Sequence, residues 1–181
     1  MNHPCAHARR QFGFTLVESL MVLAVTAIVL GAAAPHFGAA LERRHLEGAS
    51  AQLETDIQFA RSAAGARNHT LRIAFTSQAG GSCYIVHTGR ANDCRCTPEG
   101  QAVCQGAAMP IRTAAFAVGG PLQLRSNVGA MIFDPAVGTV TPTGTLRFTG
   151  RQGHEVRLIV NIMGRVRSCT PSPDLRGYPR C

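Results

Sequence analysis

The chain has 181 residues and a formal net charge of +8, and all 18 of its basic residues are arginine. This length is enough for one domain with a hydrophobic core of its own, and the absence of internal repeats and low-complexity segments excludes repeat architectures. Arginine offers a planar set of donors for phosphate and carboxylate, but a base-composition bias in the genome would also produce an all-arginine set. Composition therefore leaves the binding partner open.

The first element in the chain is an apolar segment over residues 13–34, directly after Arg9 and Arg10. Its length of about 20 residues is what a helix needs to cross a bilayer. Glu18 is the single acidic residue in this segment, and an ionised carboxylate inside a membrane costs about 3 kcal/mol unless it has a partner. The segment predicts a membrane helix over 14–34 in which Glu18 has a specific role.

Residues 13–18 read Gly-Phe-Thr-Leu-Val-Glu, and this hexapeptide resembles the processing site of type IV pilins and of the pseudopilins of type II secretion. The resemblance implies that prepilin peptidase cleaves between Gly13 and Phe14, removes the leader 1–13, and that Phe14 is then N-methylated. Glu18 becomes the fifth residue of the mature chain, one helical turn from the new terminal ammonium. It can neutralise that ammonium in its own chain or in a neighbouring subunit, so we expect it to act in assembly.

An ordinary signal peptide fits this segment less well. No small-x-small cleavage site follows Arg9 and Arg10 before Glu18, and the apolar stretch is long for such a peptide. A plain single-pass anchor is the remaining alternative. The two arginines keep the leader in the cytoplasm under the positive-inside rule, so we expect an inner-membrane protein with a periplasmic domain, which assembly transfers to a pilus on the cell surface.

Helical spacing resumes after Pro35 and predicts an amphipathic helix over residues 35–67. Its apolar positions recur at intervals of three, four and seven: Leu46, Leu53, Ile57, Ala60 and Ala64. From residue 68 to 181 the pattern changes to short strand-like runs between Gly, Pro, Asn and Ser: 70–75, 83–87, 123–125, 130–133, 145–148 and 156–162. The predicted fold is α+β and pilin-like, with a long N-terminal helix, membrane-spanning in its first half, packed on an antiparallel β-sheet with a disulfide-tied C-terminal tail.

Seven cysteines occur, and removal of the leader with Cys5 leaves six. An even number in an exported chain favours disulfides. We expect Cys169 to pair with Cys181, because the other four cluster among themselves. Those four allow three pairings, and a bond between the two closest is the least expected: Cys83, Cys94, Cys96 and Cys104. The alternative is a zinc site made by this cluster with His87, but the C-x-x-C spacing is missing and the compartment is oxidising.

No catalytic motif is present: the chain lacks a nucleophile elbow, a metalloprotease histidine pair, a phosphate-binding glycine loop and paired carboxylates. His69, His87 and His154 are expected to be surface or strand residues rather than ligands. The sequence thus predicts a structural or binding protein, with no catalytic residues, no cofactor and no metal.

The last fifth of the chain carries most of the net charge. From residue 147 onward, seven arginines stand against two acidic residues, a local charge of +5. Residues 164–167, Gly-Arg-Val-Arg, follow an apolar run, and strand alternation places Arg165 and Arg167 on the same side if the chain stays extended. Residues 170–173, Thr-Pro-Ser-Pro, make a stiff tail. A disulfide-clamped basic loop of this kind is suited to tracking phosphates.

Gly-Arg-x-Arg near the C-terminus, after a helix and a cysteine-bearing sheet, resembles the FimT-type minor pilins, whose domain is shared with the GspH-type pseudopilins. The resemblance implies binding of duplex DNA through Gly164, Arg165 and Arg167, and DNA uptake in natural transformation. Contacts to phosphates position a protein without reading bases, so we expect little sequence preference. Charge and proximity in the sequence add four further candidates: Arg147, Arg151, Arg176 and Arg180.

Two other functions remain open for the arginines. In a structural minor pilin or a type II secretion pseudopilin they would contact neighbouring subunits, and in a surface-polymer binding module they would contact other polyanions. The partners that the sequence predicts are therefore duplex DNA, other pilin subunits, prepilin peptidase and the inner membrane.

Overall fold

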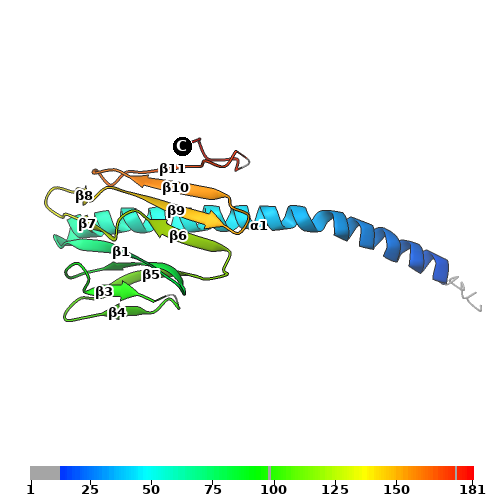
Figure 1. The fold of residues 1–181 in the computed structure, drawn as a ribbon, viewed down its shortest axis with the longest axis horizontal. Helices are drawn as coiled ribbons and strands as arrows, with labels where there is room; N and C mark the ends of the chain where they lie inside the picture. Colours follow the sequence, from blue (N-terminus) through cyan, green and yellow to red (C-terminus); the bar gives the residue numbers. More distant parts are fainter. Residues whose placement is uncertain (1–12, 98, 174) are drawn as a thin grey trace, which may run out of the picture. The chain divides into compact units, whose positions relative to one another are not determined.

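The computed structural model describes residues 13–97, 99–173 and 175–181 (Figure 1), so Cys5, Arg9 and Arg10 lie outside the described residues. The chain divides into two units, Met1–Gly38 and Ala39–Cys181. One long helix, α1 (Leu16–Arg67), contributes to both units, and all the strands belong to the second.

In the first unit, α1 begins with a capping arrangement. The Glu18 N–H donates to Thr15 Oγ1 at 3.3 Å, and an acidic residue in the first turn interacts favourably with the helix dipole. The large apolar side chains among the described residues of this unit, from Phe14 to Phe37, are exposed. Among the described residues, no single unbent helical segment has both the length and the apolar composition to cross a membrane. Two segments of α1, Leu16–Ala32 and Phe37–Arg67, meet that requirement only as a pair.

In the second unit, α1 buries one face and then ends at Arg67. The apolar stripe that the sequence predicts is confirmed, because all five of its side chains are 0–1% exposed: Leu46, Leu53, Ile57, Ala60 and Ala64. Asn68 closes the helix in a left-handed conformation, with φ of 49°. The His69 N–H donates to Ala64 O and the Asn68 N–H to Gly65 O, which is the hydrogen-bond pattern of a Schellman cap.

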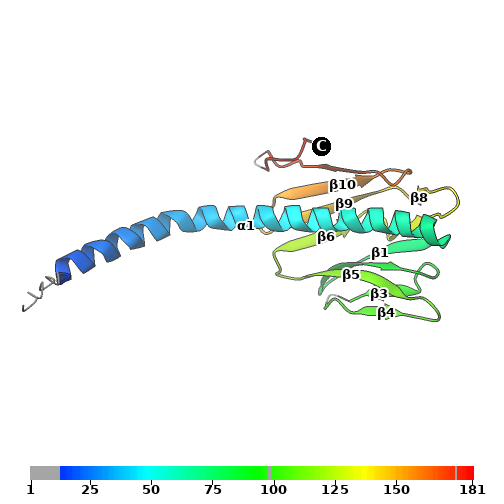
Figure 2. The same ribbon diagram turned by 180° about the vertical axis from the view of Figure 1, so that it is seen from behind.

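Two antiparallel sheets face this part of α1. The five-stranded sheet has the order β5-β2-β1-β7-β8, with bounds Pro110–Ala117, Gly81–His87, Leu71–Gln78, Ala130–Phe133 and Val140–Thr141. The four-stranded sheet has the order β11-β10-β9-β6, with bounds Val166–Cys169, Glu155–Val160, Gly144–Gly150 and Leu122–Ser126. Figures 1 and 2 show the sheets from opposite sides, with α1 behind them in the first and in front in the second.

Alternation along the four-stranded sheet separates a core face from an outer face. Its buried positions join the helix stripe in one hydrophobic core: Leu122, Leu124, Leu146, Phe148, Val156, Leu158 and Val160. Ser82 ties the two sheets together by accepting a hydrogen bond from the Leu124 N–H at 2.9 Å. Both core clusters are made from residues between Leu46 and Tyr178, so residues 39–181 contain everything that the core needs.

A two-stranded hairpin, β3 (Cys94–Cys96) and β4 (Ala102–Cys104), adds a second, smaller cluster. Disulfides Cys83–Cys96 and Cys94–Cys104 hold it to β2 and close it on itself. These are the pairings among the four clustered cysteines that the sequence left open. Because all four sulfurs are bonded in pairs, the cluster presents no thiolate to a zinc ion.

The six predicted strands correspond to β1, β2, β6, β7, β9 and β10, but five strands were not predicted. The longest of these, β5, contains a proline and three alanines, residues that are depleted in strands, and its pairing with β2 comes from tertiary packing. The others have four residues or fewer: β3, β4, β8 and β11. The strand predicted over 156–162 ends earlier in the structure, because β10 stops at Val160 and a turn follows.

A buried carboxylate joins α1 to the five-stranded sheet. Asp56 accepts a hydrogen bond from the Tyr84 hydroxyl at 2.7 Å and pairs with Arg112 Nη1 at 2.5 Å. The Arg112 guanidinium also lies over the Phe59 ring, 3.9 Å from its centroid. Burial raises the pKa of Tyr84, and its hydrogen bond to Asp56 raises it further, so the hydroxyl stays a donor.

A second buried carboxylate holds α1 to the turn between β9 and β10. Glu42 accepts hydrogen bonds from the Gln152 N–H at 2.8 Å and from His154 Nδ1 at 2.9 Å. A Cβ atom at Gly150 would overlap this carboxylate. Glu42 and Asp56 therefore fix the helix to the sheets at two points.

His87 gives the domain a pH-dependent stability. Its side chain is buried, Nδ1 donates to Thr88 O at 2.7 Å, and within the described chain Nε2 has no hydrogen-bond partner. Burial, assisted by Arg72, lowers the pKa of His87 below its ordinary 6.5. The unfolded chain therefore binds a proton that the folded chain does not, and stability falls as the pH drops below about 6.5.

We expect His87→Leu to remove this part of the acid destabilisation, measured as the free energy of unfolding between about pH 7 and pH 5. The exposed His69 offers a control, and His69→Leu should keep the parental pH dependence. An unchanged pH dependence in the His87 variant would contradict the assignment.

Candidate nucleic-acid interface

The Gly-Arg-x-Arg motif lies at the hairpin between β10 and β11. Asn161 organises the turn: its N–H donates to Arg165 O at 3.1 Å, and its Oδ1 accepts from the N–H groups of Met163 and Arg165 at 3.0 and 2.9 Å. The chain reverses over residues 162–164, and Gly164 takes the left-handed conformation that closes the turn, with φ of +70°.

Gly164 also lies against α1. Its carbonyl accepts a hydrogen bond from Gln58 Nε2 at 3.1 Å, and a Cβ atom would come within 2.9 Å of Arg61 Cδ and 3.0 Å of Val140 Cγ2. Both the backbone conformation and the close packing therefore favour glycine. The turn that presents the two arginines is held to the helix and is not a free loop.

Arg165 and Arg167 are both exposed, on either side of Val166. Val166 packs against the hydrophobic core, so alternation directs its two neighbours away from the core. Arg165 lies in the turn and Arg167 in β11, opposite Ile159. Among residues 13–97, 99–173 and 175–181, no carboxylate lies within 4.0 Å of either guanidinium.

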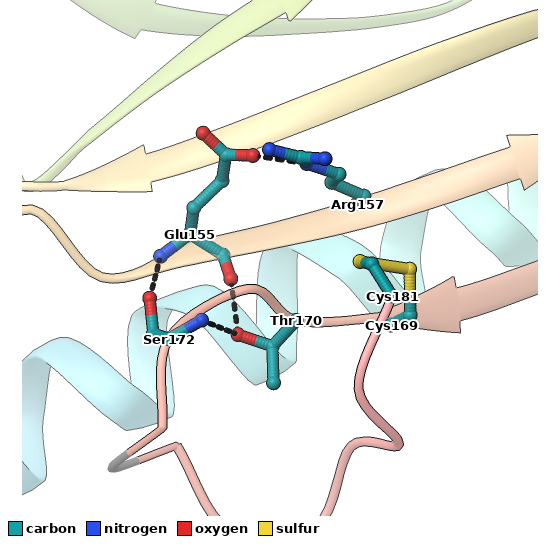
Figure 3. The surroundings of a disulfide bond; sticks show 6 residues. All are labelled: Glu155, Arg157, Cys169, Thr170, Ser172 and Cys181. Carbon is teal, nitrogen blue, oxygen red and sulfur yellow. Dashed lines mark hydrogen bonds and ion pairs between the residues drawn. A yellow bond between two sulfur atoms is a disulfide. The ribbon is translucent and has the colours of Figure 1, made fainter.

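The C-terminal tail is fixed beside β10. The structure pairs Cys169 with Cys181, the bond that the sequence analysis favoured. Figure 3 shows the hydrogen bonds next to it: Thr170 Oγ1 donates to Glu155 O at 2.6 Å, and the Glu155 N–H donates to Ser172 Oγ at 3.1 Å. Further along, Leu175 is buried in the core.

The other candidate arginines lie elsewhere on the domain. Gly177, next to Arg176, lies near the Arg43 guanidinium, whereas Gly164, next to Arg165, lies against Arg61. Arg43 and Arg61 are separated along α1 by roughly 27 Å, at 1.5 Å per residue. The structure therefore does not bring Arg176 to the motif.

Arg151 and Arg180 are also outside the turn. Arg151 follows β9 at the opposite end of β10 and donates to the carbonyls of Gly119 and Gly120. Arg180 is exposed and forms an isolated parallel β-bridge with Thr170. Thr170 lies about 10 Å along the strand direction from Arg167.

Arg147 lies on the outer face of the four-stranded sheet, and here the structure adds two arginines that sequence reasoning missed. Arg157 on β10 and Arg125 on β6 are its direct cross-strand partners. In the sequence, Arg157 contributes only to the local charge sum, and Arg125 gives no signal because it lies some 40 residues before the motif. Strand register, which no local pattern in the sequence supplies, brings the three together.

The predicted processing residues lie at the start of the described chain. Gly13 and Phe14 precede α1, and the Phe14 side chain is 84% exposed. Glu18 is exposed in the first turn of the helix.

Comparison with known proteins places these features in a family. The family described as type II transport protein GspH matches residues 49–164, more than half of the chain. The prokaryotic N-terminal methylation motif matches residues 8–34. No curated protein sequence matches this chain.

A solved structure shows the same fold. The type IV minor pilin FimU of Pseudomonas aeruginosa PAO1, in space group P21, aligns with a TM-score of 0.51 at 20% identity, over 70% of this chain and 89% of that one. Its P65 crystal form aligns with a TM-score of 0.49 at 19% identity, over 68% and 91%. A helix packed on antiparallel sheets, the GspH match and the methylation motif agree, and the chain belongs to the GspH family of type IV pilin-like proteins.

Proposed function

We propose that this protein is a minor pilin of the FimT type, which enters a filament through its N-terminal helix and binds duplex DNA through the hairpin over residues 161–167. The observation that carries the proposal is the pair Arg165 and Arg167. Both are exposed, without a carboxylate partner in the described chain, on a turn held by Asn161 and α1. The GspH match ends at Gly164, so these arginines lie beyond the matched region.

The chemistry of the turn suits phosphates. Guanidinium groups bind phosphate oxygens in a two-pronged geometry, and a rigid turn presents them without a large ordering cost on binding. Duplex DNA carries one negative charge per roughly 1.7 Å of its axis. Such contacts recognise the backbone, and we infer binding with little sequence preference.

The test is binding of a duplex of roughly 30 bp by residues 39–181, at about 50 mM salt. We expect unrelated duplex sequences to bind alike. The double variant Arg165→Gln/Arg167→Gln should weaken all of them, while Arg90→Gln/Arg95→Gln, which removes the same charge from exposed positions elsewhere, should bind like the parent. If the parent binds no duplex, DNA binding is refuted and a structural role takes its place.

A secretion pseudopilin is the second candidate, favoured by the description of the matching family as a type II transport protein. In that function the two arginines would contact a neighbouring subunit. The same variants separate the two roles. If the parent binds no duplex and Arg165→Gln/Arg167→Gln loses filament assembly, the result favours the pseudopilin.

For processing and assembly, we infer that prepilin peptidase cuts before Phe14, within the matched methylation motif. Glu18 then lies one helical turn from the new terminal ammonium, whose charge it can neutralise in an apolar filament core.

We expect Glu18→Ala to leave the globular domain folded but to reduce incorporation in filaments strongly, because an unpaired ammonium would have to be buried. Immunoblots of sheared filaments against whole cells measure the incorporated fraction. Incorporation at the parental level would refute the assembly role of Glu18.

A further inference from the structure

Three arginines form a row across the outer face of the four-stranded sheet. Arg147 on β9 is the direct cross-strand partner of Arg125 on one side and of Arg157 on the other. Adjacent strands lie about 4.8 Å apart, and residues directly opposite each other share a face. Like charges in such positions are destabilising, so a bound anion would relieve the repulsion within the row.

Within the described part of the chain, only one of the three has a carboxylate partner. Arg157 pairs with Glu155 on the same strand. Arg125 and Arg147 are exposed, and no carboxylate in the described part of the chain lies within 4.0 Å of either.

A hollow of about 260 Å³ opens beside these two arginines, lined by Arg125, Ser126, Asn127, Thr145 and Arg147. The side-chain acceptor atoms of Ser126 and Asn127 at its edge already have partners. Ser126 Oγ donates to Val128 O at 2.6 Å and accepts from the Val128 N–H, and Asn127 Oδ1 accepts from the Thr145 N–H at 2.8 Å. The remaining polar side-chain groups of Asn127 and the two arginines are donors, so the hollow is suited to an anion.

The row continues from the hairpin. Arg167 lies opposite Ile159, two residues along β10 from Arg157. Arg157, Arg147 and Arg125 then lie on the successive strands β10, β9 and β6. The distance from β11 to β6 is about 14 Å, or three strand spacings. A duplex presents about four phosphates per strand over that length.

We propose that Arg125 and Arg147 form a phosphate-binding site that extends the DNA interface from the hairpin across the outer face of the four-stranded sheet. The duplex then lies across β11, β10, β9 and β6, and not along the C-terminal tail. The choice of DNA as the polyanion rests on the proposed function, whereas the location of the site rests on the register and the hollow.

The experiment compares double variants of residues 39–181 with the same loss of charge. Arg125→Gln/Arg147→Gln tests the sheet, Arg165→Gln/Arg167→Gln tests the hairpin, and Arg90→Gln/Arg95→Gln is the control. Binding of a labelled duplex is measured from about 50 to about 200 mM salt. Loss of two phosphate contacts should make the slope of log affinity against log salt concentration shallower by about 1.8. Over that salt range, the affinity of the variant should therefore fall by a factor roughly tenfold smaller than that of the parent.

Four outcomes separate this proposal from the proposed function. Equal losses in the sheet and hairpin variants, with a parental control, support both. A parental slope in the sheet variant beside a reduced slope in the hairpin variant overturns the sheet site alone, whereas the reverse supports the sheet site and overturns the hairpin. No duplex binding by the parent at about 50 mM salt overturns both.

A second measurement excludes misfolding as the cause. Because the two opposed arginines repel each other, we expect Arg125→Gln/Arg147→Gln to unfold at a temperature no lower than the parent. A large fall in that temperature would mean that the arginines stabilise the fold, and would overturn the proposal.

Discussion

Asp56→Ala should destabilise the domain by about 3 kcal/mol, because it leaves the buried Tyr84 hydroxyl without its acceptor and removes the partner of Arg112. Breaking a fully buried pair costs about 3–5 kcal/mol, but the Arg112 side chain is 41% exposed and can regain water. Chemical unfolding of residues 39–181 measures the change.

The control for this substitution lies on the same helix. Gln52 is exposed, and Gln52→Ala should alter stability by less than about 0.5 kcal/mol. A similarly small effect at Asp56 would show that the carboxylate does not hold α1 to β2 and β5.

Loss of the Cys169–Cys181 disulfide should cost about 2–3 kcal/mol. The bond closes a short loop, with a sequence separation of 12, and the chain-entropy estimate for loops of about 15 residues is about 3 kcal/mol. We expect Cys169→Ser/Cys181→Ser to lower the free energy of unfolding by that amount and to expose the tail to proteases, since Leu175 is then anchored to the core without a covalent bond.

The matched variant is Cys94→Ser/Cys104→Ser, which removes a disulfide of similar span at the β3–β4 hairpin. It should leave the tail resistant to proteases. A protease-resistant tail in the Cys169→Ser/Cys181→Ser variant would show that the hydrogen bonds between Thr170, Ser172 and Glu155 suffice to hold it.

Much of the fold could be predicted because it depends on local patterns. The stripe from Leu46 to Ala64 follows helical spacing. Between turn residues, β2 carries an apolar run and β9 alternates apolar and polar residues. β5 could not be predicted in this way, because its alanines and proline do not favour a strand. It becomes a strand because it pairs with β2.

The candidate site shows the same limit. Alternation predicts that Arg165 and Arg167 lie on the same side of the chain, opposite to Val166. The preference for glycine at position 164 follows from the turn. Proximity in the sequence suggested Arg176, which the helix contacts place far from the motif. Arg125 could not be found, because its position beside Arg147 is set by the register of β6 on β9.

The most direct test of the account is the salt dependence of duplex binding by residues 39–181 and by their Arg165→Gln/Arg167→Gln variant. If each arginine neutralises one phosphate, the affinity of the parent should fall steeply with salt, and the variant should show a log–log slope smaller by about 1.8 and weaker binding to every duplex alike. Identical slopes and affinities for parent and variant would contradict DNA binding at the hairpin.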